Sequence, residues 1–221
     1  MQCRKGINAM SVSIRLSKAT PQQIRYSCLN YHYAKSVPAS QVAFACFENN
    51  IFIGCIISSG GATPNIAKAY KLLQGQVIEL VRVALNKEAH KAPTTQYISV
   101  SLKLLKKIKP MVKVVISYAD KGYQGHEGVI YQAGNWLHIG NSEANWILVN
   151  GKPMHPRSAN AKYGKLDNIP GGYKYIEGAL KKKYIYVFDK DLRAELESKA
   201  LGFQSKESGA IPTGTHQKEL S

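Results

Sequence analysis

Strand-like and helix-like segments alternate along residues 12–139, and no other feature of the sequence constrains the fold as strongly. An opening strand and helix are followed by two apolar runs in tandem, and after these runs helices and strands alternate. This order predicts an α/β domain with a mixed central sheet flanked by helices. The expected strands are 12–16, 42–47, 51–57, 77–85, 112–118 and 136–139, and three of the expected helices are 21–29, 65–73 and 129–133. A fourth helix is expected to run to Ile108, with Thr94 or Thr95 as its cap.

Two local signals support this order. Thr20-Pro21-Gln22-Gln23 has the residues of a helix start: a hydroxyl cap, a proline at the first helical position and a glutamine three residues after the cap. Glu48-Asn49-Asn50 joins the tandem apolar runs, and asparagine tolerates the positive φ that tight hairpin turns require. These runs are therefore predicted to form a β-hairpin.

The charge of the chain favours a polyanionic partner. The sequence has 30 Lys and Arg against 14 Asp and Glu, a formal net charge of +16, with a pI near 9.7. An excess of this size indicates nucleic acid more often than any other partner. The alternative is a surface charged only for solubility, although acidic residues serve solubility better.

The cysteines and the apolar runs bear on the cellular compartment. The four cysteines form no C-x-x-C pair, and Cys46 and Cys55 lie inside apolar runs. Thiols used as small core side chains are typical of a reducing cytoplasm, and they give no indication of a zinc site. The first ten residues lack the apolar stretch of a signal peptide, and no apolar run approaches the roughly 18 residues of a membrane span. We therefore expect a cytoplasmic protein with no membrane partner.

Composition divides the chain into four parts. Beyond residue 150 the sequence becomes rich in Lys, Gly, Pro and Tyr, and its last clear elements are a strand over Tyr184–Phe188 and a helix over Asp191–Leu201. The closing residues are polar and are predicted to be disordered. The predicted parts are a loose leader (1–10), a catalytic domain (11–150), a basic C-terminal extension packed on that domain (151–202) and a disordered tail (203–221).

A candidate site follows the strand predicted over residues 112–118. Asp120 comes at the carboxyl end of this strand, where open α/β sheets bind their ligands. The glycine-rich loop after it lets the backbone approach a substrate, and Tyr131 is expected on the next helix, directed toward the same sheet edge. Taken alone, Asp120 fits equally well as a helix cap or as a hydrogen-bond acceptor in a loop.

Three parts of the sequence resemble the Mom family of phage DNA-modification proteins: Ser117–Asp120 together with Gly125–Trp136, the segment Glu79–Leu85, and Asn30–Tyr33. The resemblance extends over residues 12–140. It implies an N-acetyltransferase-like (GNAT-like) fold and transfer of a methylcarbamoyl (carbamoylmethyl) group to N6 of adenine in duplex DNA, which protects phage DNA from restriction. It also implies a phage-encoded enzyme acting in the bacterial host, and iron(II) as a cofactor. The donor of the group is unknown.

The resemblance implies a candidate active site made of residues whose roles are ambiguous when each is considered alone. His32 and Tyr33 would otherwise be a surface cluster; with Asp120 they become candidates for acid–base chemistry, and His32 and Asp120 become candidate iron(II) ligands. Tyr131 would orient the donor or protonate its leaving group. Because reactive groups must converge on one small target, His32, Tyr33 and Asp120 are predicted to lie within about 10 Å of one another.

Arg82 is a further catalytic candidate. It lies in a strand expected to be buried, where its charge needs a partner: the donor, a phosphate or Asp120. Glu79 is not expected to be that partner, because an odd number of positions separates the two residues and their side chains should leave on opposite faces of the strand.

The segment Asn86–Thr94 corresponds to the turn on which N-acetyltransferases bind the pyrophosphate of acetyl-CoA, a glycine-rich turn at a helix N-terminus. Here the turn contains no glycine, and Pro93 removes a backbone donor. We therefore expect conventional acetyl-CoA binding to be lost. The helix start with Lys91, Thr94 and Thr95 is a candidate site for another anionic group of the donor.

The candidate DNA-binding residues are Lys181, Lys182, Lys183, Lys174 and Arg157. They would hold backbone phosphates, while the tyrosines of the segment 151–183 stack on a splayed or flipped base. The alternative for this segment is a solvated loop. The expected partner is duplex DNA with the target adenine flipped out, and a homodimer is left open.

Two other functions are compatible with the residues. One is an acyl-CoA-dependent N-acetyltransferase acting on protein or small amines, against which the missing glycine turn argues. The other is a DNA-binding module without catalytic activity. In such a module, substitution of Asp120 would change neither DNA affinity nor any activity.

Overall fold

The computed structural model describes residues 12–61, 65–120, 127–143, 146–176 and 180–209. The predicted leader, residues 1–10, lies outside the described residues, and so do residues 121–126 of the glycine-rich loop. The chain divides into two compact units. The first comprises residues 1–118 and 129–136, and the second comprises residues 119–128 and 137–221.

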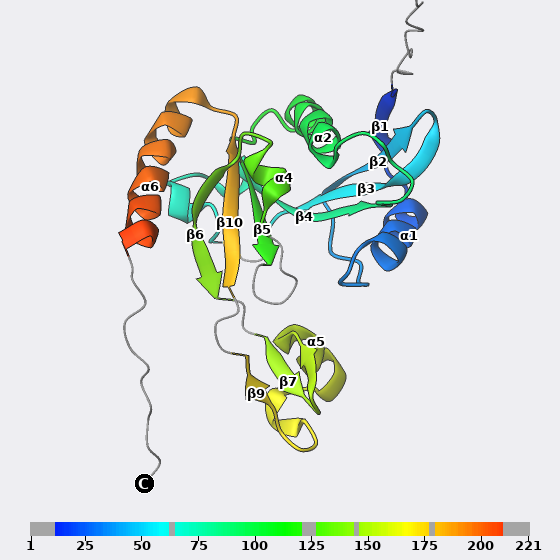
Figure 1. Cartoon of the computed structure of the whole chain (residues 1–221), viewed down its shortest axis with the longest axis vertical. Coiled ribbons are helices and arrows are strands. Elements are labelled where there is room, and N and C mark those ends of the chain that lie inside the picture. The colour runs from blue at the N-terminus through cyan, green and yellow to red at the C-terminus, as the bar shows by residue number, and fades with distance from the viewer. Residues whose placement is uncertain (1–11, 62–64, 121–126, 144–145, 177–179, 210–221) are drawn as a thin grey trace, which may run out of the picture. The chain divides into compact units, whose positions relative to one another are not determined.

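The first unit is a mixed sheet with helices on both faces (Figure 1), as the sequence predicts. Its strand order is β1-β2-β3-β4-β5, and neighbouring strands are antiparallel except β4 and β5, which are parallel. Its strands are β1 (Ile14–Lys18), β2 (Val42–Glu48), β3 (Ile51–Ser59), β4 (Val77–Leu85) and β5 (Val114–Asp120), the last two residues of β5 belonging to the second unit. Its helices are α1 (Pro21–Tyr31), α2 (Thr94–Ile108) and α4 (Val129–Gln132).

Both local sequence signals are confirmed. The Thr20 side chain accepts from the backbone N–H of Gln23, and the Gln23 side chain accepts from the backbone N–H of Thr20, a reciprocal capping box. Asn49 and Asn50 turn the hairpin between β2 and β3 with φ values of 49° and 67°. Elements set by contacts between neighbouring residues thus form where the sequence predicts them.

Alternate residues of β2 face the two helical layers. Ala45 is fully buried in a cluster with Cys28 of α1 and Cys55 of β3. Glu48, three positions further along, leaves the other face of the strand and reaches Tyr97 of α2. Helices α1 and α2 therefore cover opposite faces of the sheet, as Figure 1 also shows.

The parallel strands β4 and β5 pair only at their beginnings. Their ladder joins Val77–Glu79 to Val114–Ile116, although β4 continues to Leu85. Just past the end of the ladder, the Ser117 hydroxyl bonds the carbonyl oxygen of Leu80 at 2.9 Å. A side chain thus takes the acceptor that a ladder N–H would otherwise satisfy.

A β-bulge in β4 changes which of its side chains share a face. Leu80 pairs with Ser58, and Arg82 pairs with Ile57, so the residue between Leu80 and Arg82 is extra. Ser58 and Ile57 are consecutive and face opposite sides of β3, and their partners therefore do the same. The extra residue brings Glu79 and Arg82 to the same side of β4. The sequence-based expectation that these two side chains leave on opposite faces is wrong.

The second unit contains an antiparallel strand pair and a small separate sheet. β6 (Leu137–Glu143) pairs with β10 (Leu180–Val187), and α6 (Lys190–Gly209) contacts both strands. The small sheet has the order β8-β7-β9. Its elements are β7 (Ile147–Val149), β8 (Lys152–Met154), β9 (Lys174–Tyr175), α5 (Pro156–Tyr163) and the 3₁₀ turn η3 (Leu166–Asn168).

The small sheet has a hydrophobic core of its own. Ile147 and Val149 of β7 are buried against Ala159 of α5 and against Ile169, with Tyr163 among the partly buried residues around them. The alternative of a solvated loop for this segment is therefore wrong over its described residues.

Two helical predictions need correction. Where the sequence predicts a helix over residues 65–73, the structure has two separate 3₁₀ turns, η1 (Lys68–Tyr70) and η2 (Gln74–Gln76). Lys71, with φ 54°, follows the first turn in the left-handed region and ends it.

The last helix is longer than predicted. Helix α6 runs over Lys190–Gly209, so residues 203–209 are helical rather than part of a disordered tail, and residues 210–221 lie outside the described residues. Despite its length, α6 is not an apolar helix. None of the helices in the described parts of the chain has both the length and the apolar character needed to cross a membrane.

Candidate active site

His32 caps the end of α1 and is largely buried. Its exposed fraction is 9%, whereas the neighbouring Tyr33 is 46% exposed. The two rings lie 4.2 Å apart between centroids, tilted by 31°. The Nδ1 atom of His32 accepts from the backbone N–H of Ala34 at 3.1 Å. Since an amide nitrogen can only donate, a neutral His32 ring carries its proton on Nε2 and presents that atom as a donor.

Arg82 contacts the segment that follows α1. Its guanidinium donates to the carbonyl oxygen of Val81 at 2.7 Å and to the Ser36 hydroxyl at 3.4 Å, and its buried Nε has no hydrogen-bond partner among the described residues. Both of these acceptors are neutral. The guanidinium is near enough to Cys28 to lower the pKa of that thiol, although burial, the larger effect, raises it. Arg82 thus brings a positive charge to the same side of the first unit as the end of α1.

Asp120 is the last residue of β5, and it is 4% exposed. A carboxylate this buried must be held by partners that favour its charge, or it must be protonated. Asp120 belongs to the second unit, whereas His32 and Tyr33 belong to the first. Their predicted approach to within about 10 Å therefore stays a prediction.

Tyr131 takes part in a hydrogen-bond chain that sequence reasoning missed. The Ser117 hydroxyl lies 2.9 Å from the carbonyl oxygen of Leu80 and 2.8 Å from the Tyr131 hydroxyl. Ser117 has one hydroxyl proton, and the carbonyl oxygen can only accept it, so Tyr131 donates to Ser117. Ser117 and Leu80 lie on one face of the sheet, and Arg82 lies on the opposite face. Tyr131 therefore reaches the sheet on the face opposite to the one that carries the end of α1.

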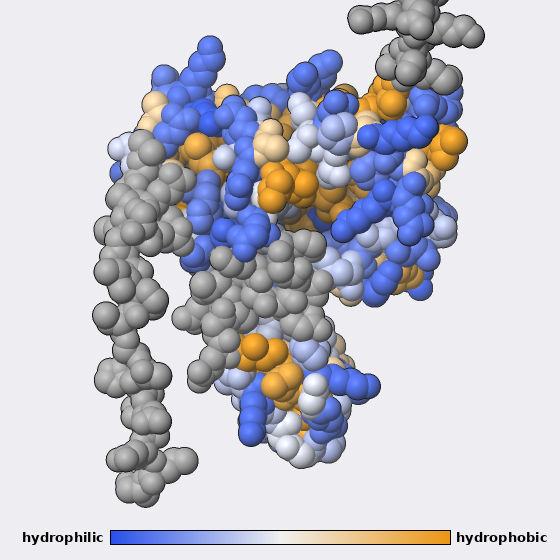
Figure 2. Space-filling view, in the orientation of Figure 1, coloured by the Kyte–Doolittle hydropathy of each residue, from blue (hydrophilic) through white to orange (hydrophobic). Residues whose placement is uncertain are grey.

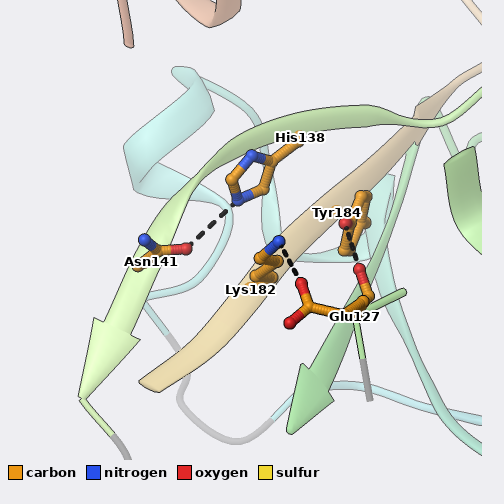
Figure 3. A network of polar contacts seen from close by, with 5 residues as sticks. All are labelled: Glu127, His138, Asn141, Lys182 and Tyr184. Atoms are coloured by element: carbon orange, nitrogen blue, oxygen red, sulfur yellow. Dashed lines mark hydrogen bonds and ion pairs between the residues drawn. The ribbon is translucent and has the colours of Figure 1, made fainter. Parts of the chain in front are cut away.

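The last two residues of the glycine-rich loop, Glu127 and Gly128, contact side chains of β10 within the second unit (Figure 3). The Tyr184 hydroxyl donates to the carbonyl oxygen of Glu127 at 2.8 Å, and Lys182 forms an ion pair with the Glu127 side chain at 2.5 Å. Gly128 lies directly against the Tyr184 ring, with φ 77°, and a Cβ there would come within 2.3 Å of a ring carbon. The ring of Tyr184 stacks in turn near His138, 5.2 Å away. This packing explains why a glycine ends the loop.

The turn before α2 holds a buried carboxylate from β2. Glu48 is 4% exposed, and it accepts from the backbone N–H of Lys91 at 2.9 Å, from that of Ala92 at 3.1 Å and from the Tyr97 hydroxyl at 2.5 Å. Burial by itself raises the pKa of Glu48, but these three donors and the nearby His90 outweigh it, so the pKa lies below its ordinary value. The sequence offered one weak signal for this contact: an acidic residue at the end of an apolar run.

The predicted iron(II) ligands do not fit a metal site in their present state. A histidine ligand usually donates through its second ring nitrogen, whereas His32 accepts there and keeps its proton on Nε2. No group of three or more His, Cys, Asp or Glu side chains suited to a metal ion occurs in the described ranges. Iron(II) binding by His32 and Asp120 stays a prediction.

The predicted DNA-binding residues differ in how accessible their charges are. Lys174 of β9 is exposed, whereas Lys181, Lys182 and Lys183 of β10 are half-buried. Lys182 is paired with Glu127, and burial lowers the pKa of Lys183. Arg157 lies on α5, and its side chain is outside the described part of the structure. Hydrophilic side chains predominate over the β6, β10 and α6 region in Figure 2.

A sheet whose antiparallel strands lead into a parallel pair that soon parts, with helices on both faces, defines the N-acetyltransferase-like class. A solved structure supports this fold. The structure of NAA60 from Arabidopsis thaliana in complex with acetyl-CoA matches with a TM-score of 0.50 and 10% identity, covering 80% of this chain and 99% of that chain. A Bacillus subtilis acetyltransferase in complex with CoA matches with a TM-score of 0.47 and 9% identity, covering 81% of this chain and 100% of that one. At such identities the likeness concerns the fold alone.

Within this class the chain belongs to the Mom protein family, which it matches over residues 13–205. It is 28% identical over 133 residues to the methylcarbamoylase Mom of Escherichia phage Mu. That match covers 59% of this chain and 55% of the relative, so it spans little more than half of the curated protein. The family and the fold predicted from the sequence are both confirmed.

Proposed function

We propose that this protein transfers a methylcarbamoyl (carbamoylmethyl) group to N6 of adenine in duplex DNA and thereby protects phage DNA from restriction in the host cytoplasm. One observation carries the proposal: the match to the Mom family extends over residues 13–205, a range that includes each proposed catalytic residue. The similarity to a methylcarbamoylase supports the chemistry. The net charge of +16 supports DNA as the substrate.

The reaction requires that adenine leave the base stack, because N6 lies in the paired edge of the duplex. N6 then forms a bond to the transferred group while the donor loses its bond to the leaving group, and N6 gives up one proton. Asp120, a buried carboxylate at the end of β5, is the proposed acceptor of that proton. His32 and Tyr33 at the end of α1 would orient the base, with Nε2 of His32 as a hydrogen-bond donor.

Arg82 and Tyr131 have different proposed roles. Arg82, whose described acceptors are neutral, would hold an anionic part of the donor or a DNA phosphate. Tyr131 directs its own hydroxyl proton to Ser117, so its oxygen presents lone pairs to other groups. This favours a positioning role for Tyr131 over protonation of the leaving group. Lys91, Thr94 and Thr95 at the start of α2 are the predicted contacts to the donor.

The proposal is tested by mass spectrometry of nucleosides from DNA of cells that express the full chain. The wild-type protein and Glu88→Gln, which changes an exposed carboxylate in the turn before α2, should both give a modified deoxyadenosine. Asp120→Asn should give none, while its affinity for duplex DNA remains, since phosphate contacts supply most of that affinity. Unmodified nucleosides from well-expressed wild-type protein would contradict the proposal. An acetylated base or acetylated protein would favour the acetyltransferase alternative.

A further inference from the structure

Two backbone donors of the turn between β4 and α2 are already occupied by a side-chain carboxylate. Lys91 N–H lies 2.9 and 3.0 Å from the two carboxylate oxygens of Glu48, and Ala92 N–H lies 3.1 Å from one of them. Pro93, the cap of α2, has no N–H to offer. The two N–H groups just ahead of the helix therefore bind an anion that belongs to the chain itself.

Three further N–H groups of this turn are also satisfied internally. Asn86 N–H donates to the carbonyl oxygen of Ile53 at 2.8 Å, and Ala89 N–H donates to that of Asn86 at 3.2 Å. Glu88 N–H donates to the Asn86 side chain at 3.1 Å. A ligand anion at Lys91 and Ala92 would have to displace the Glu48 carboxylate before it gained a bond to either N–H.

Glu48 is also held from the helix side. Tyr97, in the first turn of α2, is fully buried and donates its hydroxyl proton to the same carboxylate. His90 packs its ring 5.7 Å from that of Tyr97, and its Nδ1 lies 2.8 Å from the carbonyl oxygen of Ala92. The carboxylate therefore has donors from two elements and little contact with solvent, the environment that a helix N-terminus gives to a bound phosphate or carboxylate.

We propose that Glu48 is the permanent anion of this turn, in the place where a coenzyme diphosphate would bind, and that the donor of the transferred group is held without a diphosphate at the start of α2. A bound CoA does not fit these residues, since its diphosphate would compete for donors already in use and would meet the negative charge of Glu48. The donor class follows from the proposed function and rests on it: the anionic group of the donor, where it has one, binds at Arg82 on the opposite face of the sheet. This replaces the anion site that the sequence predicts at Lys91, Thr94 and Thr95.

The test uses small anions to replace the missing carboxylate. Glu48→Ala leaves the Lys91 and Ala92 N–H groups and the Tyr97 hydroxyl facing a carboxylate-sized gap, so formate should restore the bonds. Thermal unfolding is measured with increasing formate at fixed ionic strength, against chloride. We expect the thermal unfolding midpoint of Glu48→Ala to rise with the formate concentration, as it does when a ligand binds only the native state, and the underlying binding to be saturable. Wild-type protein and Glu88→Ala, which removes an exposed carboxylate of the same turn, should show no such rise. A folded Glu48→Ala variant that ignores formate would overturn the proposal.

A second measurement does not depend on the variant folding. The backbone amide resonances of Lys91 and Ala92 in the wild-type protein are followed while CoA or inorganic pyrophosphate is added. Both resonances should stay in place at millimolar ligand, and their displacement in a saturable manner would show that a diphosphate takes the turn and that the proposal is wrong. Neither readout involves base modification, so these results are independent of whether modified deoxyadenosine is found.

Discussion

Tyr131 donates a hydrogen bond to Ser117 at 2.8 Å, just beyond the point where the β4–β5 ladder ends. The Ser117 hydroxyl donates in turn to the carbonyl oxygen of Leu80. A tyrosine predicted for catalysis thus also holds together the place where the two parallel strands part. Substitutions of Tyr131 and of Ser117 separate the two roles.

Tyr131→Phe removes one buried hydrogen bond and should lower the free energy of unfolding by about 1 kcal/mol. Ser117→Ala removes the hydrogen bonds that Ser117 makes to the Leu80 carbonyl and to the Tyr131 hydroxyl, and it should lower the free energy of unfolding by about 1–3 kcal/mol. Urea denaturation measures both values, and nucleoside mass spectrometry measures modification. If Tyr131 only positions the strands, Ser117→Ala should reduce modification at least as much as Tyr131→Phe. Loss of modification in Tyr131→Phe alone would assign the hydroxyl a direct part in the reaction.

Gly128→Ala should destabilise the protein more than Gly151→Ala. Both glycines have positive φ, 77° and 72°, so each alanine meets the same backbone strain of about 1–2 kcal/mol. Only at Gly128 would the new Cβ also collide with the Tyr184 ring, which adds about 1–3 kcal/mol of overpacking; at Gly151 nothing lies within 4 Å. Urea denaturation of the two variants compares the costs. Equal destabilisation would mean that the Tyr184 ring moves aside freely.

These contacts also show which features the sequence could predict. The α1 cap and the hairpin at Asn49-Asn50 depend on residues at most a few positions apart, so their residue types predict them. The bond from Glu48 to Lys91 joins residues 43 positions apart and depends on the placement of two strands and a turn. The bulge in β4 has no residue signal of its own, and it reverses the faces that simple alternation assigns. The small sheet was missed because its strands are of two or three residues, too short for a periodic pattern.

The lysines of β10 should contribute unequally to DNA binding. Each phosphate contact that is lost should reduce the slope of log K against log salt concentration by about one unit. Replacement of Lys181, Lys182 and Lys183 together by Ala should flatten this slope, but Lys182→Ala alone should change it less than Lys181→Ala or Lys174→Ala. The reason is that the charge of Lys182 is already paired with Glu127. Salt titrations with one duplex compare the variants. A dominant effect of Lys182 would show that DNA displaces Glu127 from its partner.

Glu48 should give the protein a stability that depends on acid pH. The pKa of Glu48 in the folded chain lies below its ordinary value of 4.5, so its contribution is fully present above about pH 4.5 and is lost as the pH falls through the lower, folded value. Glu48→Gln cannot accept from all three donors, so the variant should be less stable than the wild type at pH 7, and this difference should shrink as the pH falls below 4.5. Urea denaturation between pH 7 and pH 3 measures the difference, and Glu88→Gln, at an exposed position of the same turn, should show no such trend. A difference between wild type and Glu48→Gln that stays constant down to pH 3 would show that Glu48 is not held as a carboxylate by Lys91, Ala92 and Tyr97.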